Sequence, residues 1–383
     1  MPTCIYCRCN FASAGGEHIL QNSLGARWTS PTIVCGNDQK HFGGTIDLDL
    51  SNQLKTFRSL FDHETGRGNP APTLKDLPTL RGNRVALEPG GVLQLNQPEV
   101  TVKPHTANSK AVEISMRDDR DIGWALHLLK QQVPNAQIDE SLIRRLAVRA
   151  TKGVEEVVNL QLQFGGPRYH RAGVKSVFNL AAACGAPAHD PCFDAVRGFV
   201  REGRGDSDQF IRFAVKHNFV PATKLSPVDH FIAVVSRGNL VQGFLQYYGA
   251  LQHVLQLATD YHGPAFCFGY VVNPLRDTNP AETRSPVFDP DRLPKFLDQP
   301  ALPTEATMAW MRARLGPVIE FHLNAGRKKR IAQIVDEVLG PHAGKAFTPD
   351  LMRKLAGRIA FEVRGIARPA DGPATASGNT PRS

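Results

Sequence analysis

Four of the seven cysteines of this chain lie within its first 35 residues, in a segment that begins MPTCIYCRCN. Cys4 and Cys7 have the C-x-x-C spacing that lets two thiolates reach one tetrahedral metal ion. Cys35 is the obvious third ligand, and Asp38 follows it at the same spacing. A carboxylate can also bind zinc, so these residues predict a structural zinc site at the start of the chain.

The residues alone leave the fourth zinc ligand open, because Cys9 and His41 lie within reach as well as Asp38. An odd, clustered set of cysteines favours metal ligation over disulfides in a reducing compartment. No apolar run is long enough to span a bilayer, and the first residues lack the apolar core of a signal peptide. We therefore expect a soluble, cytoplasmic protein with no membrane partner.

The pair Glu17-His18 lies between the two halves of the expected zinc site. Neighbouring residues on a regular strand point to opposite faces, so the pair can serve one site only at a strand end or in a loop. The glycine-rich segment ASAGGEHILQNSLG permits such a loop. The β-like stretch PTIVC and the polar helix start GNDQKHFG follow. This order of strand, loop, strand and helix predicts a ββα finger clamped by zinc.

The ordered series C-x-x-C, EHI, SLG, C-x-x-D-Q and FG-x-x-ID-x-x-L, with an arginine beyond it, spans residues 4–58. It resembles the HNH endonucleases, in the subgroup whose motif begins Glu-His-Ile. The resemblance implies phosphodiester cleavage, of DNA rather than RNA, with a catalytic Mg²⁺ or Mn²⁺ ion beside the structural zinc. It implies that His18 is the general base, that Glu17 is a metal ligand, and that Gln39 helps to bind the catalytic ion.

The chemistry suits these residue types, because a neutral imidazole can take a proton from water, and carboxylate and amide oxygens suit a hard cation. Three positions depart from the family pattern. Asp38 replaces the last cysteine of a second C-x-x-C, Gln39 replaces an Asn or His, and Gln21 replaces a usual proline.

The rest of the chain carries no motif of comparable specificity. We expect an α+β fold with a finger at 1–62, a linker at 63–78 and an α+β domain of unknown type at 79–285. A helical, basic region at 286–367 and a disordered tail at 368–383 complete this division. The periodicity predicts a helix over 46–61, strands near 84–116, helices within 122–160 and 169–184, and strands between 228 and 273. It also predicts helices near 304–324, 327–340 and 348–365.

The formal net charge of +9 suits a polyanionic partner, since each neutralised phosphate releases counterions. The run Arg327, Lys328, Lys329 and Arg330 is the best local source of phosphate contacts, and we expect it to open a helix. A run of this kind is often only a solvated face. Few aromatic residues interleave with it, so base stacking on single strands is not indicated.

These observations lead to a first hypothesis of a metal-dependent HNH-type endonuclease acting on double-stranded DNA. The second is a non-catalytic nucleic-acid- or protein-binding module that keeps the zinc site as a scaffold. The third is an enzyme whose chemistry lies within residues 80–290, where no motif supports it. Cys184, His189 and Cys192 have a spacing that suits a metal, but we interpret them as incidental residues of a loop.

Overall fold

The structure, a computed structural model, describes residues 1–364 except 13, 81–83, 107–108, 117–120, 135–140, 142–157, 159, 161, 215–218, 220–224, 227, 276–280 and 343–347. Contacts in space divide the chain into two units. Unit 1 consists of 1–73, 89–91 and 161–324, and unit 2 consists of 74–88, 92–160 and 325–383. This division follows contacts in space, whereas the boundaries expected from composition follow the sequence. The expected disordered tail lies outside the described residues.

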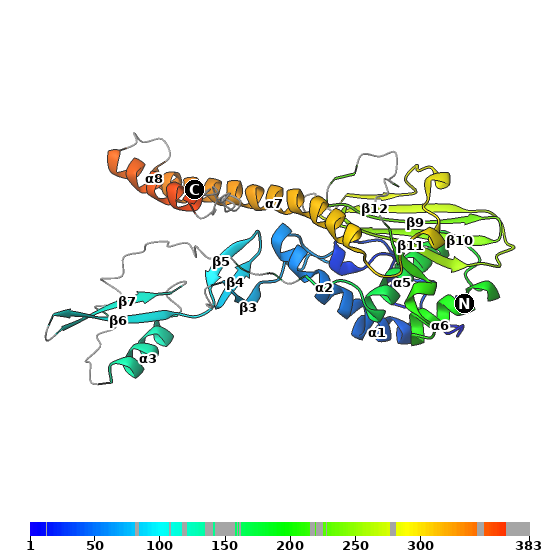
Figure 1. Cartoon of the computed structure of the whole chain (residues 1–383), viewed down its shortest axis with the longest axis horizontal. Helices are drawn as coiled ribbons and strands as arrows, with labels where there is room; N and C mark the ends of the chain where they lie inside the picture. Colours follow the sequence, from blue (N-terminus) through cyan, green and yellow to red (C-terminus); the bar gives the residue numbers. More distant parts are fainter. Residues whose placement is uncertain are drawn as a thin grey trace, which may run out of the picture. The chain divides into compact units, whose positions relative to one another are not determined.

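The centre of unit 1 is a six-stranded antiparallel sheet in the order β13-β12-β9-β10-β11-β8, seen at the right of Figure 1. The β-rich segments of the sequence form its strands, and Gly238, with a φ of 58°, makes the expected turn between β9 and β10. The strands are β8 (Ile211–Phe213), β9 (His230–Arg237), β10 (Leu240–Tyr247), β11 (Leu251–Ala258), β12 (Cys267–Asn273) and β13 (Ala281–Arg284).

Both faces of this sheet are covered. Phe231, Ala233 and Val235 of β9 belong to a buried cluster on one face, together with Phe244 of β10. The opposite face packs against helix α5 (Pro167–Ala183), which is predicted almost to the residue. Burial on both faces explains why β9 reads as a continuous apolar run rather than an alternating one.

Helix α5 approaches the sheet closely because a glycine lies at the contact on each element, Gly173 on α5 and Gly243 on β10. A Cβ atom added at Gly243 of β10 would lie 2.5 Å from Cγ1 of Val177 on α5. A Cβ at Gly173 of α5 would lie 2.8 Å from Cδ2 of Leu245 in the same way. Larger side chains at these positions would move the helix away from the sheet.

The N-terminal segment of unit 1 has the expected order of two strands followed by a helix. Strand β1 (Glu17–His18) pairs antiparallel with β2 (Thr29–Ser30), and helix α1 (Gly36–Gly44) follows. Helix α2 (Ile46–Phe61) confirms the predicted helix, because its predicted apolar face is buried at Ile46, Leu50, Leu54, Phe57 and Phe61.

The N-terminal segment is built into the core of unit 1. The Tyr6 hydroxyl donates a hydrogen bond of 2.8 Å to Oδ1 of Asn179 on α5, and the Tyr6 ring packs edge-on against Phe178. Within the segment expected to be a linker, His63 and Thr65 are buried, and Nε2 of His63 lies 2.7 Å from the Tyr248 hydroxyl. The first 73 residues therefore share one core with the sheet.

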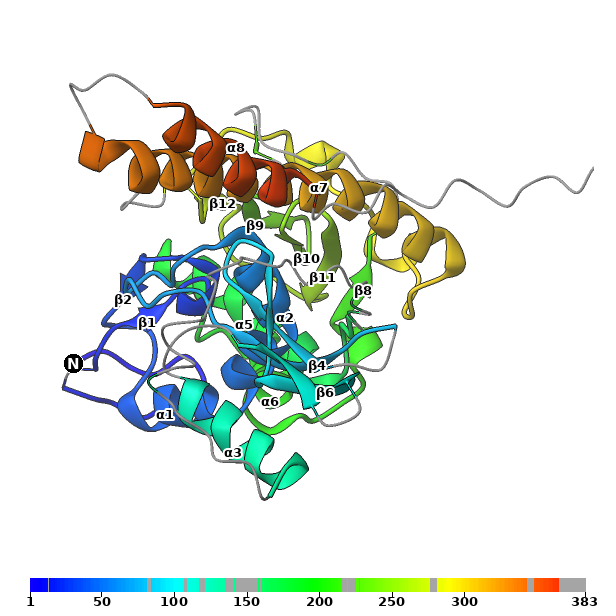
Figure 2. The same cartoon turned by 90° about the vertical axis from the view of Figure 1, so that its left-hand side faces the viewer.

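Unit 2 contains the smaller antiparallel elements that the sequence predicts. A three-stranded sheet consists of β3 (Leu74–Pro78), β4 (Arg84–Glu88) and β5 (Val92–Leu95). A hairpin of β6 (Glu99–Thr106) and β7 (Ser109–Ser115) precedes helix α3 (Ile122–Gln132). Helix α8 (Pro349–Arg364) runs alongside the C-terminal part of α7 in Figure 2, and Nη2 of Arg358 lies 2.7 Å from Oε2 of Glu337.

Two local predictions are wrong. The helices expected at 304–324 and 327–340 form one continuous helix, α7 (Glu305–Leu339), so the basic run lies inside a helix and does not open one. A glycine such as Gly326 costs a helix only about 1 kcal/mol relative to alanine, and the strong helix formers that follow it outweigh that cost. The strand expected at PTIVC lies earlier, at Thr29–Ser30, because Pro31 lacks the N–H that would continue the ladder.

The mixed α+β class is confirmed, with antiparallel sheets in both units. Most of the residues expected to be helical between 135 and 157 lie outside the described part of the chain. No helix within the described residues is long and apolar enough to cross a bilayer.

Candidate functional site

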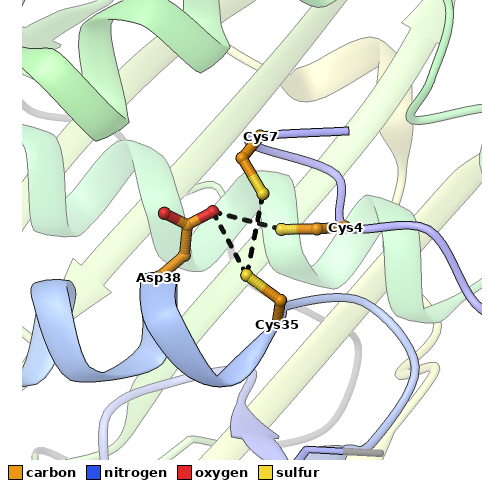
Figure 3. Close-up of side chains that lie close together, drawn as sticks. All are labelled: Cys4, Cys7, Cys35 and Asp38. Atoms are coloured by element: carbon orange, nitrogen blue, oxygen red, sulfur yellow. Dashed lines mark hydrogen bonds between the residues drawn. The ribbon is translucent and has the colours of Figure 1, made fainter. Parts of the chain in front are cut away.

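Cys4, Cys7, Cys35 and Asp38 converge at the N-terminal end of α1 (Figure 3). Cys4 and Cys7 come from the tight turn at the start of the chain, in which the Arg8 amide donates to the Cys4 carbonyl oxygen at 3.0 Å. Cys35 is the N-cap residue of α1, and Asp38 follows in its first turn. Residues three apart are neighbours on a helix surface, so the Cys35–Asp38 spacing alone directs both side chains to one point.

The geometry of these four side chains fits a zinc ion. One ligand atom from each residue lies within 4.8 Å of the others, and the Cys7 and Cys35 sulfur atoms are 3.6 Å apart. A tetrahedral site with Zn–S bonds of about 2.3 Å has edges of about 3.8 Å. Cys4, Cys35 and Asp38 are buried. Three thiolates and one carboxylate form a closed donor set, which is typical of a structural zinc site.

Asp38 is held by an arginine from a distant part of the chain. Its Oδ2 accepts a hydrogen bond of 3.2 Å from the Cys4 sulfur, while its Oδ1 accepts one of 2.9 Å from Nε of Arg201 on α6 (Asp194–Glu202). Burial would raise the pKa of Asp38, but the hydrogen bonds from Arg201 and the thiols outweigh it and lower that pKa. The carboxylate is therefore charged and oriented for a cation.

The thiols of Cys4 and Cys7 bind protons more tightly than an ordinary cysteine, whereas the Cys35 thiol does not. Burial raises the pKa of Cys4 to about 11 and also raises the pKa of Cys7. The pKa of Cys35 is lowered, because hydrogen bonds from the Asp38 backbone and from neighbouring thiols outweigh its desolvation. Metal ligation requires thiolates, so binding at this centre displaces protons and weakens as the pH falls.

Glu17 lies in a buried ion-pair network. Its Oε1 is 2.5 Å from Nζ of Lys175 on α5, and the same Nζ is 2.7 Å from Oδ2 of Asp47 on α2. Nδ2 of Asn179 donates a longer hydrogen bond of 3.4 Å to the same Glu17 oxygen. The Lys175 side chain is only 1% exposed and the Glu17 side chain 8%. The Glu17 and Asp47 carboxylates therefore already share one cation, the Lys175 ammonium group.

His18 lies beside the same charged cluster as its neighbour, because Lys175 and Asp47 both affect its pKa. Burial, followed by the charges of Arg67 and Lys175, lowers the pKa of His18 to about 4, so the imidazole is neutral near pH 7. Both ring nitrogens are shielded from solvent, and neither makes a well-aligned hydrogen bond within the described residues. The charge of Asp47 and, to a smaller extent, the Ala26 backbone favour the protonated ring.

The residues that the resemblance assigns to a catalytic ion do not fit one. Glu17 is neutralised by Lys175, and Nε2 of Gln39 donates to the Val34 carbonyl oxygen at 3.2 Å. Within the described residues, the zinc centre is the single group of histidine, cysteine or acidic side chains that converges on one point. We therefore derive no reaction step through a catalytic divalent ion.

The remaining candidates of the sequence do not form a second centre. Cys184, His189 and Cys192 do not converge on one point within the described residues. Around the basic run, Lys328 is exposed, while Arg327 and Arg330 are half-buried on α7. Sequence reasoning missed Lys175 and Arg201, since no local spacing connects them to the finger, and it gave no role to Asp47, which lies within the motif FG-x-x-ID-x-x-L.

Comparisons of the chain with protein-family models, with curated proteins and with solved structures found no match. Function must therefore be argued from the site itself.

Proposed function

We propose that this protein is a zinc-stabilised phosphodiester hydrolase of the HNH type, with His18 as its general base and nucleic acid as its substrate. The observation that carries the proposal is the order of β1, β2 and α1 around the four-residue metal centre, with His18 on β1. These elements lie within residues 4–58, whose series of motifs resembles the HNH endonucleases.

The protonation state of His18 supports this role. A general base must be unprotonated at working pH, and the pKa of His18, lowered to about 4, meets this condition, while it also makes the ring a weaker base than one that titrates near pH 7. Arg67 is exposed and lies close enough to His18 to affect that pKa. A guanidinium in this position suits the negative charge of a scissile phosphate.

The reaction assigned to His18 is hydrolysis. A water oxygen attacks the phosphorus atom while a His18 ring nitrogen accepts the water proton. The bond between phosphorus and the leaving oxygen breaks, and the leaving oxygen takes a proton from solvent. Because both His18 nitrogens are shielded in the free protein, the substrate must displace part of their cover before water can reach them.

The test is cleavage of plasmid DNA, linear duplex DNA and RNA by the purified, zinc-loaded protein. Each substrate is assayed with Mg²⁺, with Mn²⁺ and without added divalent ion. His262→Ala is the matched control, because His262 is 79% exposed and pairs only with the equally exposed Asp260 among described residues. We expect His18→Ala to lower cleavage by at least about 100-fold, the usual contribution of a general base, and His262→Ala to leave it unchanged.

A second function, a non-catalytic zinc module that binds nucleic acid or protein, is favoured by a different observation. Glu17 is fully engaged with Lys175, and the His18 ring nitrogens are buried. This function predicts bound zinc, no cleavage of any substrate, and partner binding that is indifferent to His18→Ala. Equal cleavage by wild type and His18→Ala, or none by either, would overturn the hydrolase proposal.

A further inference from the structure

We propose that the ammonium group of Lys175 occupies a cation position between Glu17 and Asp47, so that the wild-type protein binds no divalent ion through Glu17. The proposal concerns the same finger as the proposed function. It rests on the geometry of the ion pairs, and it is tested by cation binding and not by cleavage, so the two proposals fail separately.

The two carboxylates converge on the Lys175 nitrogen at hydrogen-bond distance. Glu17 Oε1 and Asp47 Oδ2 lie 2.5 Å and 2.7 Å from Nζ, and they come from different elements, β1 and α2. Lys175 enters from a third element, α5. A single positive centre thus joins three segments of unit 1.

The second oxygen of Asp47 and the neighbours of Glu17 also have hydrogen-bond partners. Oδ1 of Asp47 accepts a hydrogen bond of 2.7 Å from Nε2 of Gln21. Asn179 donates to Glu17 and accepts from the Tyr6 hydroxyl at 2.8 Å. These bonds fix the carboxylates in place, so the position of the cation is defined by the fold and not by the lysine alone.

The charge of the cluster explains why a cation is required there. Two carboxylates with one ammonium leave a net negative charge, and burial raises the pKa of Glu17 despite the attraction of Lys175. The Lys175 nitrogen also lies 5.2 Å from the centre of the Phe42 ring, which excludes water from that side. A divalent ion cannot enter while the tethered ammonium holds both oxygens, because the two positive centres would repel at contact distance.

Removal of the Lys175 side chain should convert the position of its ammonium group into a divalent-ion site. Lys175→Ala removes the ammonium and leaves space for an ion and its water, whereas Lys175→Met removes the charge but fills the space. Breaking a buried ion pair in either variant should lower Tm by about 10 °C. Millimolar Mn²⁺ should restore several degrees in Lys175→Ala, by preferential binding to the folded state, and none in Lys175→Met or wild type.

A measurement on the wild-type protein keeps the proposal falsifiable if the variants do not fold. Mn²⁺ is titrated into zinc-loaded wild type and Glu17→Gln, and binding is followed by calorimetry and by the electron paramagnetic resonance signal of free Mn²⁺. We expect no binding that depends on Glu17. Stoichiometric Mn²⁺ binding to wild type that Glu17→Gln abolishes would overturn the proposal. A folded Lys175→Ala protein whose Tm does not change on addition of Mn²⁺ would also overturn it.

Discussion

The sharpest prediction concerns Arg201, which touches no sulfur atom of the zinc centre but holds its carboxylate. Nε of Arg201 donates to Oδ1 of Asp38 at 2.9 Å, which leaves Oδ2 directed toward the thiols of Cys4 and Cys35, at 3.2 and 3.7 Å. Removing the partner that orients a metal ligand typically lowers metal affinity by about 10- to 100-fold. Arg201→Ala should therefore weaken zinc binding by about 1.4–2.7 kcal/mol.

The assay is competition for zinc between the protein and a chromophoric chelator at fixed pH. Arg204→Ala is the matched control, because Arg204 lies just beyond the same helix, is 74% exposed and pairs with Glu202 and not with Asp38. Cobalt(II) spectra of the same proteins report the ligand set, since thiolate-to-cobalt bands scale with the number of sulfur ligands. Asp38→Ala should keep the three-thiolate bands and bind zinc more weakly than Arg201→Ala.

Two results would refute this reasoning. Equal zinc affinities of Arg201→Ala and Arg204→Ala would show that the Asp38 contact does not matter to the metal. A cobalt spectrum that changes in Cys9→Ser but not in Asp38→Ala would make Cys9 the fourth ligand, because its sulfur is 3.1 Å from that of Cys7.

Three further predictions concern stability and binding. Gly243→Ala should destabilise unit 1 by about 1–3 kcal/mol in urea unfolding, because its Cβ would lie 2.5 Å from Val177. Burial lowers the pKa of His170 to about 4 and that of His253 to about 3, so the unfolded chain binds more protons and stability falls as the pH drops below about 6.5. His170→Phe should remove about 2–3 kcal/mol of this loss at pH 4.5, and an equal acid loss in the variant would contradict the assignment. Lys328→Ala should lower the slope of log K for DNA binding against log salt concentration by about one phosphate contact, as measured by fluorescence anisotropy. An unchanged slope would exclude that contact.

The convergence of the four candidate metal ligands could be predicted from sequence because its determinants are local. Cys4 and Cys7 share one turn, and Cys35 and Asp38 share the first turn of a helix, so spacing alone brings each pair together. The spacing of apolar residues predicted α2 for the same reason. Arg201 lies 163 positions from Asp38, and a lone arginine in a helix carries no pattern that connects it to a distant carboxylate.

Contacts between residues distant in sequence connect the N-terminal segment to helices α5 and α6. Tyr6 bonds to Asn179, Glu17 to Lys175 and Asp38 to Arg201, so each part of the N-terminal segment is fixed by α5 or α6. Zinc binding to a site that is absent from the unfolded chain contributes directly to folding free energy. The first 62 residues, expressed alone, would lack the partners of both Glu17 and Asp38 and would expose the Tyr6 ring that packs on Phe178 of α5.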